Sequence, residues 1–482
     1  MIDFRAVMNI IGWLVATLGL LMLVPLAVDY ANGNPDWRVF LFASFVSVTS
    51  GALVVVATSH SVGASLSIRQ SFLLTTLSWT VLPLFGAIPF ELGLAHVDWT
   101  EAIFEAMSGL TTTGATMFDG IDEMPPGILL WRSMLQWLGG LGIVLVALIF
   151  LPVMKVGGMQ HFRSEGFDTM GKVLPRAADI SWMLLQIYVG LTILNAGAYI
   201  LAGMNTFDAV NHALATMSTG GFSTRDASFG AYGPAAQWIC IIFMLLAGLP
   251  FIRYLQAVNG SFQPLFRDIQ IRAYLRWTLY AVGAVIAYRL IHGSDHPEVV
   301  VRETAFNVVS MFSGTGFTSA DIASWGDFPI LVMIVVGFIR ACTASTGCSI
   351  KTFRFIVLFE AIKGQIRQLV TPNRVVRLQL DGRPLSEDVV SSVIVMFSAF
   401  VVGFGVFTVL LSLTGLEMRT AFTAAWTSIC NVGPAFGAEV GPTGAMHLFP
   451  DSAKWLMTLA MMMGRLELVA VVVLLLPRFW RG

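Results

Sequence analysis

Long apolar runs alternate with short polar connections along nearly the whole chain. Each longer run has about 20 residues, which is the length of a helix that crosses the hydrocarbon core of a bilayer. The first run continues to about Val28 without a small-residue cleavage pattern, so we expect a retained helix and not a signal peptide. The pattern predicts ten transmembrane helices, at residues 9–29, 39–58, 71–94, 128–154, 181–203, 235–252, 276–292, 328–340 continuing past a break, 389–414 and 455–477.

A shorter and only partly apolar stretch lies between the third and fourth predicted spans, and another lies between the two spans of each later pair. Each stretch has about 11 residues, which is too short to cross the hydrocarbon, so we expect it to enter and leave the membrane on one side. The four predicted re-entrant pore helices cover residues 100–111, 207–217, 302–312 and 419–429. The predicted fold class is an all-α integral membrane protein.

A loop that contains glycine follows each short helix. The central glycines, at positions 114, 220, 316 and 433, recur at intervals of about 100 residues, much longer than the period of a solenoid repeat. The same order of helix, pore helix, loop and helix indicates four pseudo-repeated modules around one central pore. The predicted units are an N-terminal transmembrane hairpin at 1–66 and pore modules at 67–180, 181–272, 273–385 with a broken second helix, and 386–482.

These loops carry the candidate chemistry. Glycine permits backbone conformations that aim carbonyl oxygens at one axis, and a ring of carbonyls replaces the water around an alkali cation. A single Thr-Gly pair after a helix is typical of a C-cap, but four such loops favour a shared filter for a dehydrated monovalent cation. The predicted filter residues are Thr112, Thr113, Gly114, Ala115, Ser218, Thr219, Gly220, Gly221, Gly314, Thr315, Gly316, Phe317, Asn431, Val432, Gly433 and Pro434.

The composition supports a membrane setting. Hydrophobic residues make up 56% of the chain and charged residues 12%, which is about half the charged share of a soluble domain. The mean hydropathy is +0.77. The sequence contains no Gly-x-Ser-x-Gly elbow, His-Glu-x-x-His helix, Walker loop or Cys-x-x-Cys pair. We therefore expect neither an enzyme nor a covalent cofactor nor a nucleic-acid partner.

Charged residues differ between the two predicted sides of the membrane. Acidic residues gather in the connections that follow the filter loops, where a carboxylate-lined mouth concentrates cations, although each single residue also fits an ordinary solvated loop. They are Asp119, Asp122, Glu123, Asp321, Asp327, Glu439 and Asp451. Basic residues mark the other side as cytoplasmic, with both termini inside. They are Arg69, Lys155, Arg163, Lys172, Arg176, Arg253, Arg267, Arg272, Lys351, Arg354, Lys363, Arg367, Arg374, Arg377, Arg383, Arg478 and Arg481.

Two further features lie at membrane depth. Small and polar residues interrupt the second span of the third module, at Ala341, Cys342, Thr343, Ala344, Ser345, Thr346, Gly347, Cys348 and Ser349. Such a break is tolerated where irregular backbone lines a cavity, and the alternative is a small-residue face for helix packing. Arg465 lies inside the last apolar run, where an ionisable residue is costly and indicates a functional site. The alternative is a structural arginine neutralised by Glu467, Glu360 or carbonyls.

The chain resembles the superfamily of K⁺ transporters that includes TrkH, KtrB and fungal Trk proteins. The resemblance covers essentially the whole chain, and the N-terminal pair of spans is more similar to TrkH. Its specific marks are residues 112–116, with the sequence Thr-Thr-Gly-Ala-Thr, together with 218–223, 314–317, 431–434, 136–144 and Ser345-Thr346-Gly347.

The resemblance implies K⁺ uptake across the bacterial inner membrane, driven by the membrane potential, in a homodimer with one pore per protomer. It also implies a cytoplasmic nucleotide-binding regulator similar to TrkA. Residues 341–349 would then form a gating loop under the filter, and Arg465 would point into the cavity below it. Ala435 departs from the Gly-Pro-Gly often found in the fourth loop of this family.

A K⁺ symporter coupled to H⁺ or Na⁺ is the alternative function. Such transporters commonly use inverted repeats, whereas the four predicted modules all have the same orientation. The inner ends of the loops offer Thr112, Ser218, Gly314 and Asn431, four different side chains. We therefore expect an inner ion site that is weaker and less symmetric than one built from four identical threonines.

Overall fold

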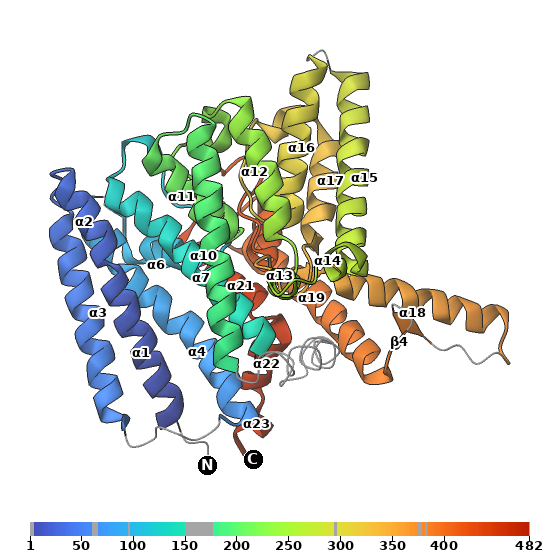
Figure 1. Ribbon diagram of the computed structural model, residues 1–482, viewed down its shortest axis with the longest axis horizontal. Helices are drawn as coiled ribbons and strands as arrows, with labels where there is room; N and C mark the ends of the chain where they lie inside the picture. The colour runs from blue at the N-terminus through green and yellow to red at the C-terminus, as the bar shows by residue number, and fades with distance from the viewer. Residues whose placement is uncertain are drawn as a thin grey trace.

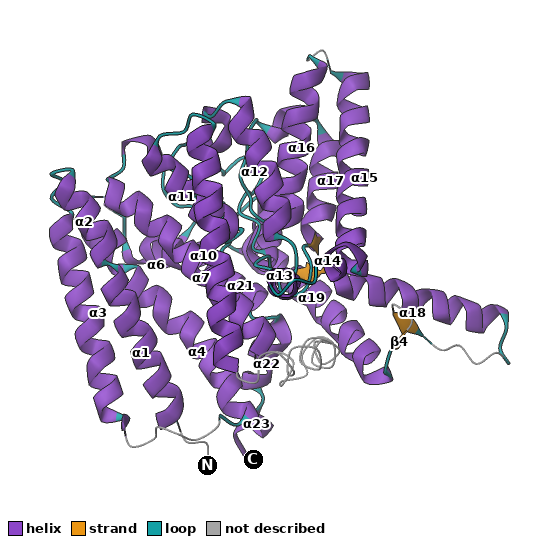
Figure 2. Ribbon diagram, viewed as in Figure 1, coloured by secondary structure: helices purple, strands orange, loops and turns teal. Residues whose placement is uncertain are grey.

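The computed structural model describes residues 4–59, 66–94, 97–149, 177–293, 296–373, 378–380 and 383–481. Helices account for most of this part of the chain (Figures 1 and 2). The strands described there are two residues long each. β1 (Ile339–Arg340) pairs in parallel with β2 (Ile350–Lys351), and β3 (Gln379–Leu380) pairs antiparallel with β4 (Arg383–Pro384). The basic residues Lys155, Arg163, Lys172, Arg176, Arg374 and Arg377 lie outside the described residues.

Six helical stretches in the described part are long and apolar enough to cross a membrane. These six stretches coincide with six of the predicted spans. The six stretches are α1 (Arg5–Leu21) with α2 (Leu23–Ala31), α3 (Trp37–Ala57), α4 (Ile68–Gly86) with α5 (Ile88–Leu92), α7 (Pro126–Ile149), α10 (Ala177–Leu201) and α19 (Glu387–Leu413). The remaining long helices are α15 (Ile269–His292) and α18 (Thr352–Val370), of which α18 projects away from the body of the molecule (Figure 1).

Two predicted spans are broken in the structure. The run at 235–252 divides into α12 (Pro234–Ala247) and α13 (Phe251–Val258), which meet at an angle of 91°. Pro250 lies at this break, where its ring disfavours a helical conformation of the preceding residue. The run at 455–477 divides into α21 (Asp451–Arg465) and α22 (Leu468–Leu475), with Glu467 between them at φ 62°. The run before the predicted gate forms the short helix α17 (Asp327–Phe338).

Four buried short helices match the predicted re-entrant segments closely. They are α6 (Trp99–Leu110), α11 (Thr206–Met217), α16 (Pro297–Ser313) and α20 (Met418–Cys430). Asp98 caps α6 by accepting a hydrogen bond from the Glu101 N–H, and Asn205 caps α11 in the same way. The third helix starts earlier than predicted because Pro297 occupies its first turn, where proline is favoured.

The short helices pack in a closed cyclic order. α11 packs on α7, α16 packs on α12, and α20 packs on α17, so each packs on the apolar helix that follows the preceding pore-type helix in the chain. The first short helix, α6, packs on α21 near the C-terminus, which closes the circle. Helices separated by most of the chain therefore surround one centre.

The N-terminal helices stand beside this ring (Figure 1). α1 packs against α3 and α4, and the α1–α3 contact is close because Gly12 and Gly51 meet backbone to backbone. Phe4 stacks on Trp480 with ring centroids 6.4 Å apart, so the two ends of the described chain meet. The remaining short helices are η2 (Ile121–Glu123), η4 (Ser228–Ala231), α14 (Gln263–Arg267), η5 (Ile322–Trp325) and α23 (Pro477–Arg481).

Candidate functional site

The loops that follow the four short helices share one backbone pattern. In each loop two residues have positive φ, and one residue lies between them. Residues other than glycine rarely adopt this conformation. The first member of each pair is Thr112 (53°), Thr219 (54°), Gly314 (87°) or Asn431 (53°). The second member is always glycine, at Gly114 (84°), Gly221 (83°), Gly316 (83°) and Gly433 (110°). The strained conformation of three non-glycine residues indicates that the surrounding structure imposes this path.

The second glycine of each loop contacts the next loop around a circle. A methyl group on Gly114 would lie under 3.0 Å from the carbonyl oxygen of Gly220. The same holds for Gly221 and Thr315, for Gly316 and Val432, and for Gly433 and Thr113. The four loops therefore close a ring in which the equivalent carbonyls are those of residues 113, 220, 315 and 432. These contacts are made by predicted filter residues from all four loops, namely Thr113, Gly114, Gly220, Gly221, Thr315, Gly316, Val432 and Gly433.

The second loop is offset by one residue from its predicted alignment. Gly221, and not Gly220, has the positive φ and the contact that match the central glycines of the other loops. Ser218 has right-handed helical φ and ψ and caps α11, so Thr219 replaces it at the inner end of the loop. Two adjacent glycines left this register ambiguous in the sequence.

Side chains behind the loops bind their backbone. Gln136 Nε2 donates to the Gly220 carbonyl at 2.6 Å, and Gln136 Oε1 accepts from the Phe222 N–H at 3.0 Å. Ser108 donates to the Ala115 carbonyl at 2.5 Å, and Ser310 donates to the Phe317 carbonyl at 2.7 Å. The first of these bonds fixes a ring carbonyl, that of Gly220, and the other three fix the residue that follows the second positive-φ glycine of its loop. Gln136 lies in a segment that the sequence singles out, but its contact with the second loop was not predicted.

A buried ion pair supports the first loop. Arg132 Nε donates to Glu105 at 2.8 Å, and both side chains are fully shielded from solvent. Glu105 also accepts hydrogen bonds from the Thr116 hydroxyl and from the Met117 N–H. The Arg132 Nη1 group donates to the Ser223 carbonyl at 3.0 Å and so connects the first loop with the second.

The predicted gate, residues 341–349, is an irregular buried loop and not a helix. The alternative of a helix packing face is therefore wrong. Parallel pairing of β1 with β2 brings the two ends of the loop together. The loop fits into the break between α12 and α13, where the Cys342 N–H donates to the Gly248 carbonyl at 3.0 Å and the Phe251 N–H donates to the Ala344 carbonyl at 2.9 Å.

Arg465 joins this loop to the first of the four ring loops. Its Nη1 group donates to the Thr112 hydroxyl at 2.8 Å and also contacts the Cys348 thiol, while Nη2 donates to the Gly139 carbonyl at 2.7 Å. Glu467 forms its ion pair with Arg354 instead of Arg465. Neutralisation of Arg465 by Glu467 is therefore wrong, whereas its hydrogen bonds to the Gly139 and Thr346 carbonyls agree with the part of the structural alternative in which carbonyls bind it.

A second buried arginine in the same place was not predicted from the sequence. Arg340 ends the apolar run before the predicted gate, and its guanidinium contacts the third and fourth ring loops. No local signal in the sequence indicates where this side chain points. An arginine at the end of a membrane helix ordinarily suggests an interfacial anchor.

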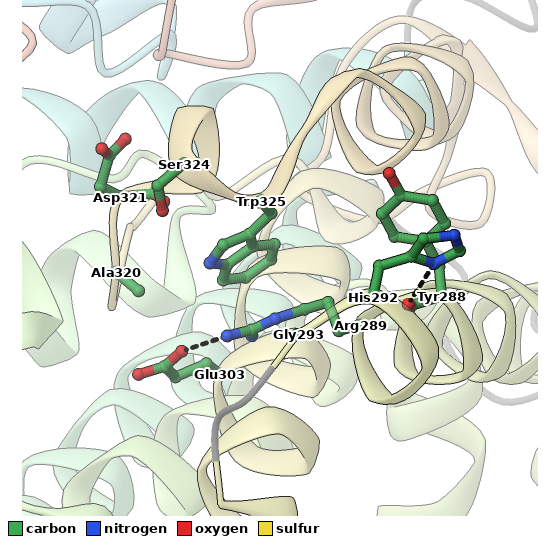
Figure 3. Close-up of a pocket in the computed structure, with 9 residues that line it drawn as sticks. All are labelled: Tyr288, Arg289, His292, Gly293, Glu303, Ala320, Asp321, Ser324 and Trp325. Carbon is green, nitrogen blue, oxygen red and sulfur yellow. Dashed lines mark hydrogen bonds and ion pairs between the residues drawn. The ribbon is translucent and has the colours of Figure 1, made fainter.

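A separate pocket of about 470 Å³ lies outside the ring. Figure 3 shows Arg289 paired with Glu303 beneath the indole of Trp325, and His292 stacked on Tyr288. The guanidinium carbon of Arg289 is 4.0 Å from the centre of the Trp325 ring. None of the predicted filter or gate residues lines this pocket.

The sequence pattern of the TrkH family, described as cation transport protein, matches residues 38–481. The chain belongs to the TrkH family. It is 38% identical to the Trk system potassium uptake protein TrkI of Halomonas elongata over 471 residues, with 97% of this chain and 95% of that protein covered. It is 36% identical to the Trk system potassium uptake protein TrkH of Escherichia coli strain K12, with 99% of each covered.

The solved structures give the same result. The crystal structure of the potassium transporter TrkH from Vibrio parahaemolyticus matches with a TM-score of 0.90 and 32% identity, and both chains are covered completely. The TrkH family is a transport family, so the expected class of membrane transport protein, not enzyme, is confirmed. Within the described residues, no group of three His, Cys, Asp or Glu side chains could hold a metal ion.

Proposed function

We propose that this chain takes up K⁺ across the bacterial inner membrane through one pore whose filter is the ring of four loops. The observation that carries the proposal is the cyclic contact of each central glycine with the carbonyl of the next loop. Carbonyl rings of this kind replace the hydration shell of K⁺. The relatives at 36–38% identity are named potassium uptake proteins, which favours K⁺ over other monovalent cations.

The membrane potential is sufficient to drive uptake. A potential of 100 mV is worth about 2.3 kcal/mol per charge, and about 1.4 kcal/mol corresponds to a tenfold concentration ratio. One positive charge can therefore be accumulated roughly fiftyfold without ATP chemistry in this chain. The acidic residues after the filter loops, Asp119 and Glu439 among them, would concentrate cations at the outer mouth.

The proposed architecture has ten membrane spans and four pore helices in the modules 67–180, 181–272, 273–385 and 386–482, after the hairpin 1–66. The cyclic packing of the short helices supports it, as do helices near the predicted spans. The excess of Lys and Arg on one side supports cytoplasmic termini.

The loop 341–349 and Arg465 form the proposed gate. The loop is buried directly beneath the first filter loop, since Cys348 contacts the Thr111 carbonyl and Arg465 contacts Thr112. Withdrawal of the loop would open the path and would separate Arg465 from the filter.

Partners complete the proposal. The chain works as a homodimer with one pore per protomer, and a cytoplasmic nucleotide-binding subunit similar to TrkA docks on the basic segments 155–180, 253–276 and 351–388. The first of these lies mostly outside the described residues. Nucleotide binding to the purified chain alone would contradict this assignment.

The deciding experiment compares a pore with a coupled symporter. We expect the chain to restore growth at low external K⁺ in a strain deficient in K⁺ uptake. In lipid bilayers it should give unitary currents that reverse at the K⁺ equilibrium potential. Saturating flux with a fixed ratio of K⁺ to H⁺ or Na⁺ would instead favour the symporter.

A further inference from the structure

Arg340 is a fully buried arginine at the inner end of the filter ring. It is the last residue of β1, directly before the gate loop. Its backbone is fixed from both sides, because its carbonyl accepts a 2.6 Å hydrogen bond from the Thr352 hydroxyl and β1 pairs with β2. The guanidinium is therefore tethered from the gate side of the loops.

The guanidinium lies where carbonyls of two filter loops converge. Its Nη2 group donates to the Gly314 carbonyl at 3.3 Å and to the Asn431 carbonyl at 2.9 Å. These two residues occupy the same position in the third and fourth loops, the first positive-φ position. A methyl group on Gly314 would overlap the guanidinium carbon, so Arg340 requires glycine there.

The hydrogen-bond partners of this guanidinium are all carbonyls. Nη1 donates to the Met311 carbonyl at 3.2 Å, and Nε has no hydrogen-bond partner in the described part of the chain. Arg465 binds Thr112 at the equivalent position of the first loop, and Lys351 binds the Gly347 carbonyl of the gate. The Cys348 thiol contacts Arg465, while Glu467 is paired with Arg354.

We propose that the Arg340 guanidinium is a tethered cation that occupies an inner ion position of the filter and makes conduction inwardly rectifying. The inference rests on the proposed K⁺ filter. Two equivalent carbonyls point at one positively charged N–H group as they would point at K⁺. A cation attached on the gate side is pushed away from the filter by K⁺ that enters from outside and is driven into it when K⁺ moves outward.

This assignment gives Arg340 control over the direction of K⁺ flow and not only a structural role. A brace would hold the loops equally in both directions of flow. A tethered cation instead competes with K⁺ for the same oxygens, and a free cation of the same shape would replace it when the side chain is removed.

The test uses the full-length chain with its cytoplasmic partner in patches of fixed orientation. The variants are Arg340→Ala and Arg340→Gln, with Arg289→Gln as the matched control because Arg289 is a buried arginine outside the ring. Inward and outward K⁺ currents are compared at equal driving force, before and after guanidinium chloride is added on the cytoplasmic side.

Arg340→Ala should raise the ratio of outward to inward current at least fivefold, and cytoplasmic guanidinium should restore rectification in this variant but not change the wild type. Unchanged rectification, or no effect of guanidinium on Arg340→Ala, overturns the proposal. If Arg340→Ala does not assemble, Arg340→Gln decides, since it keeps hydrogen-bond donors but loses the charge and should lose most of the rectification. Wild-type rectification in Arg340→Gln would then overturn the proposal. A wild type and control without K⁺-selective current would contradict the proposed function itself.

Discussion

Asn431 Nδ2 donates a 2.8 Å hydrogen bond to the hydroxyl oxygen of Thr113, 318 residues earlier in the chain. This bond joins the fourth loop to the first at the same seam where Gly433 approaches the Thr113 carbonyl. A single polypeptide has one such seam between its beginning and its end, and both a side-chain and a backbone contact close it. The ring is therefore complete within one chain.

Gly316→Ser should relax selectivity for K⁺ over Na⁺. Gly316 has φ 83°, and a side chain there would meet the Val432 carbonyl. Forcing a residue with a β-carbon into such a conformation costs about 1–3 kcal/mol, so we expect the K⁺ to Na⁺ permeability ratio to fall about tenfold or more. Reversal potentials in mixed solutions measure the ratio.

Gly444→Ser is the matched control for this substitution. Gly444 has a similar φ of 85°, but no atom lies within 4 Å of the position of an added β-carbon. The control carries the same backbone strain away from the ring and should keep the wild-type ratio. Equal ratios in the wild type and Gly316→Ser would remove Gly316 from the filter. Gly220→Ser is also expected to reduce selectivity, because its side chain would displace Gln136.

Gln136→Leu should weaken the second loop. The change removes the two hydrogen bonds to Gly220 and Phe222, each worth about 0.5–1.5 kcal/mol. We expect reduced K⁺ selectivity together with a modest loss of thermal stability in detergent.

Gln237→Leu provides the comparison for Gln136→Leu. Gln237 is also buried in a helix, and its Nε2 group donates to the carbonyls of Phe229 and Tyr232 while its Oε1 accepts from Arg302; none of these groups belongs to the ring. Gln237→Leu should lose at least as much stability and keep its selectivity. A loss of selectivity in both variants would show that a general loss of stability is responsible, and not the loss of the Gln136 hydrogen bonds to the second loop.

Much of this architecture follows from local sequence signals. Apolar character and length placed α6 at 100–111 and α11 at 207–217, within one residue of the observed Trp99–Leu110 and Thr206–Met217. The glycine loops were found for a similarly local reason, because positive φ restricts the residue type.

Long-range contacts could not be predicted in the same way. Arg340 reaches carbonyls 26 and 91 residues away, and Gln136 reaches Gly220, 84 residues away. Only the folded ring brings these groups together. The register of the second loop also depended on its neighbours, since Gly220 and Gly221 are equally flexible and the contact with Thr315 selects Gly221.

Arg465→Ala should raise K⁺ flux. A unit charge about 8 Å from a passing ion contributes roughly 2 kcal/mol at an effective dielectric constant of 20, and the variant also releases the gate from Thr112. We expect flux into liposomes to increase several-fold, whereas Arg465→Lys, which keeps the charge, should change it less. Wild-type flux in Arg465→Ala would demote this residue to a structural role.

Glu105→Gln should destabilise the protein strongly. The variant leaves the fully buried Arg132 without its counter-ion, and loss of one partner of a buried pair costs about 3–5 kcal/mol. Glu298→Gln is the control. Glu298 pairs with Arg302 on α16, the third of the four short helices, but its side chain is 55% exposed. Such pairs contribute about 0–1 kcal/mol. Thermal unfolding of both variants in the same detergent measures the difference, and a similar shift of the two midpoints would mean that the Glu105–Arg132 pair does not support the first loop.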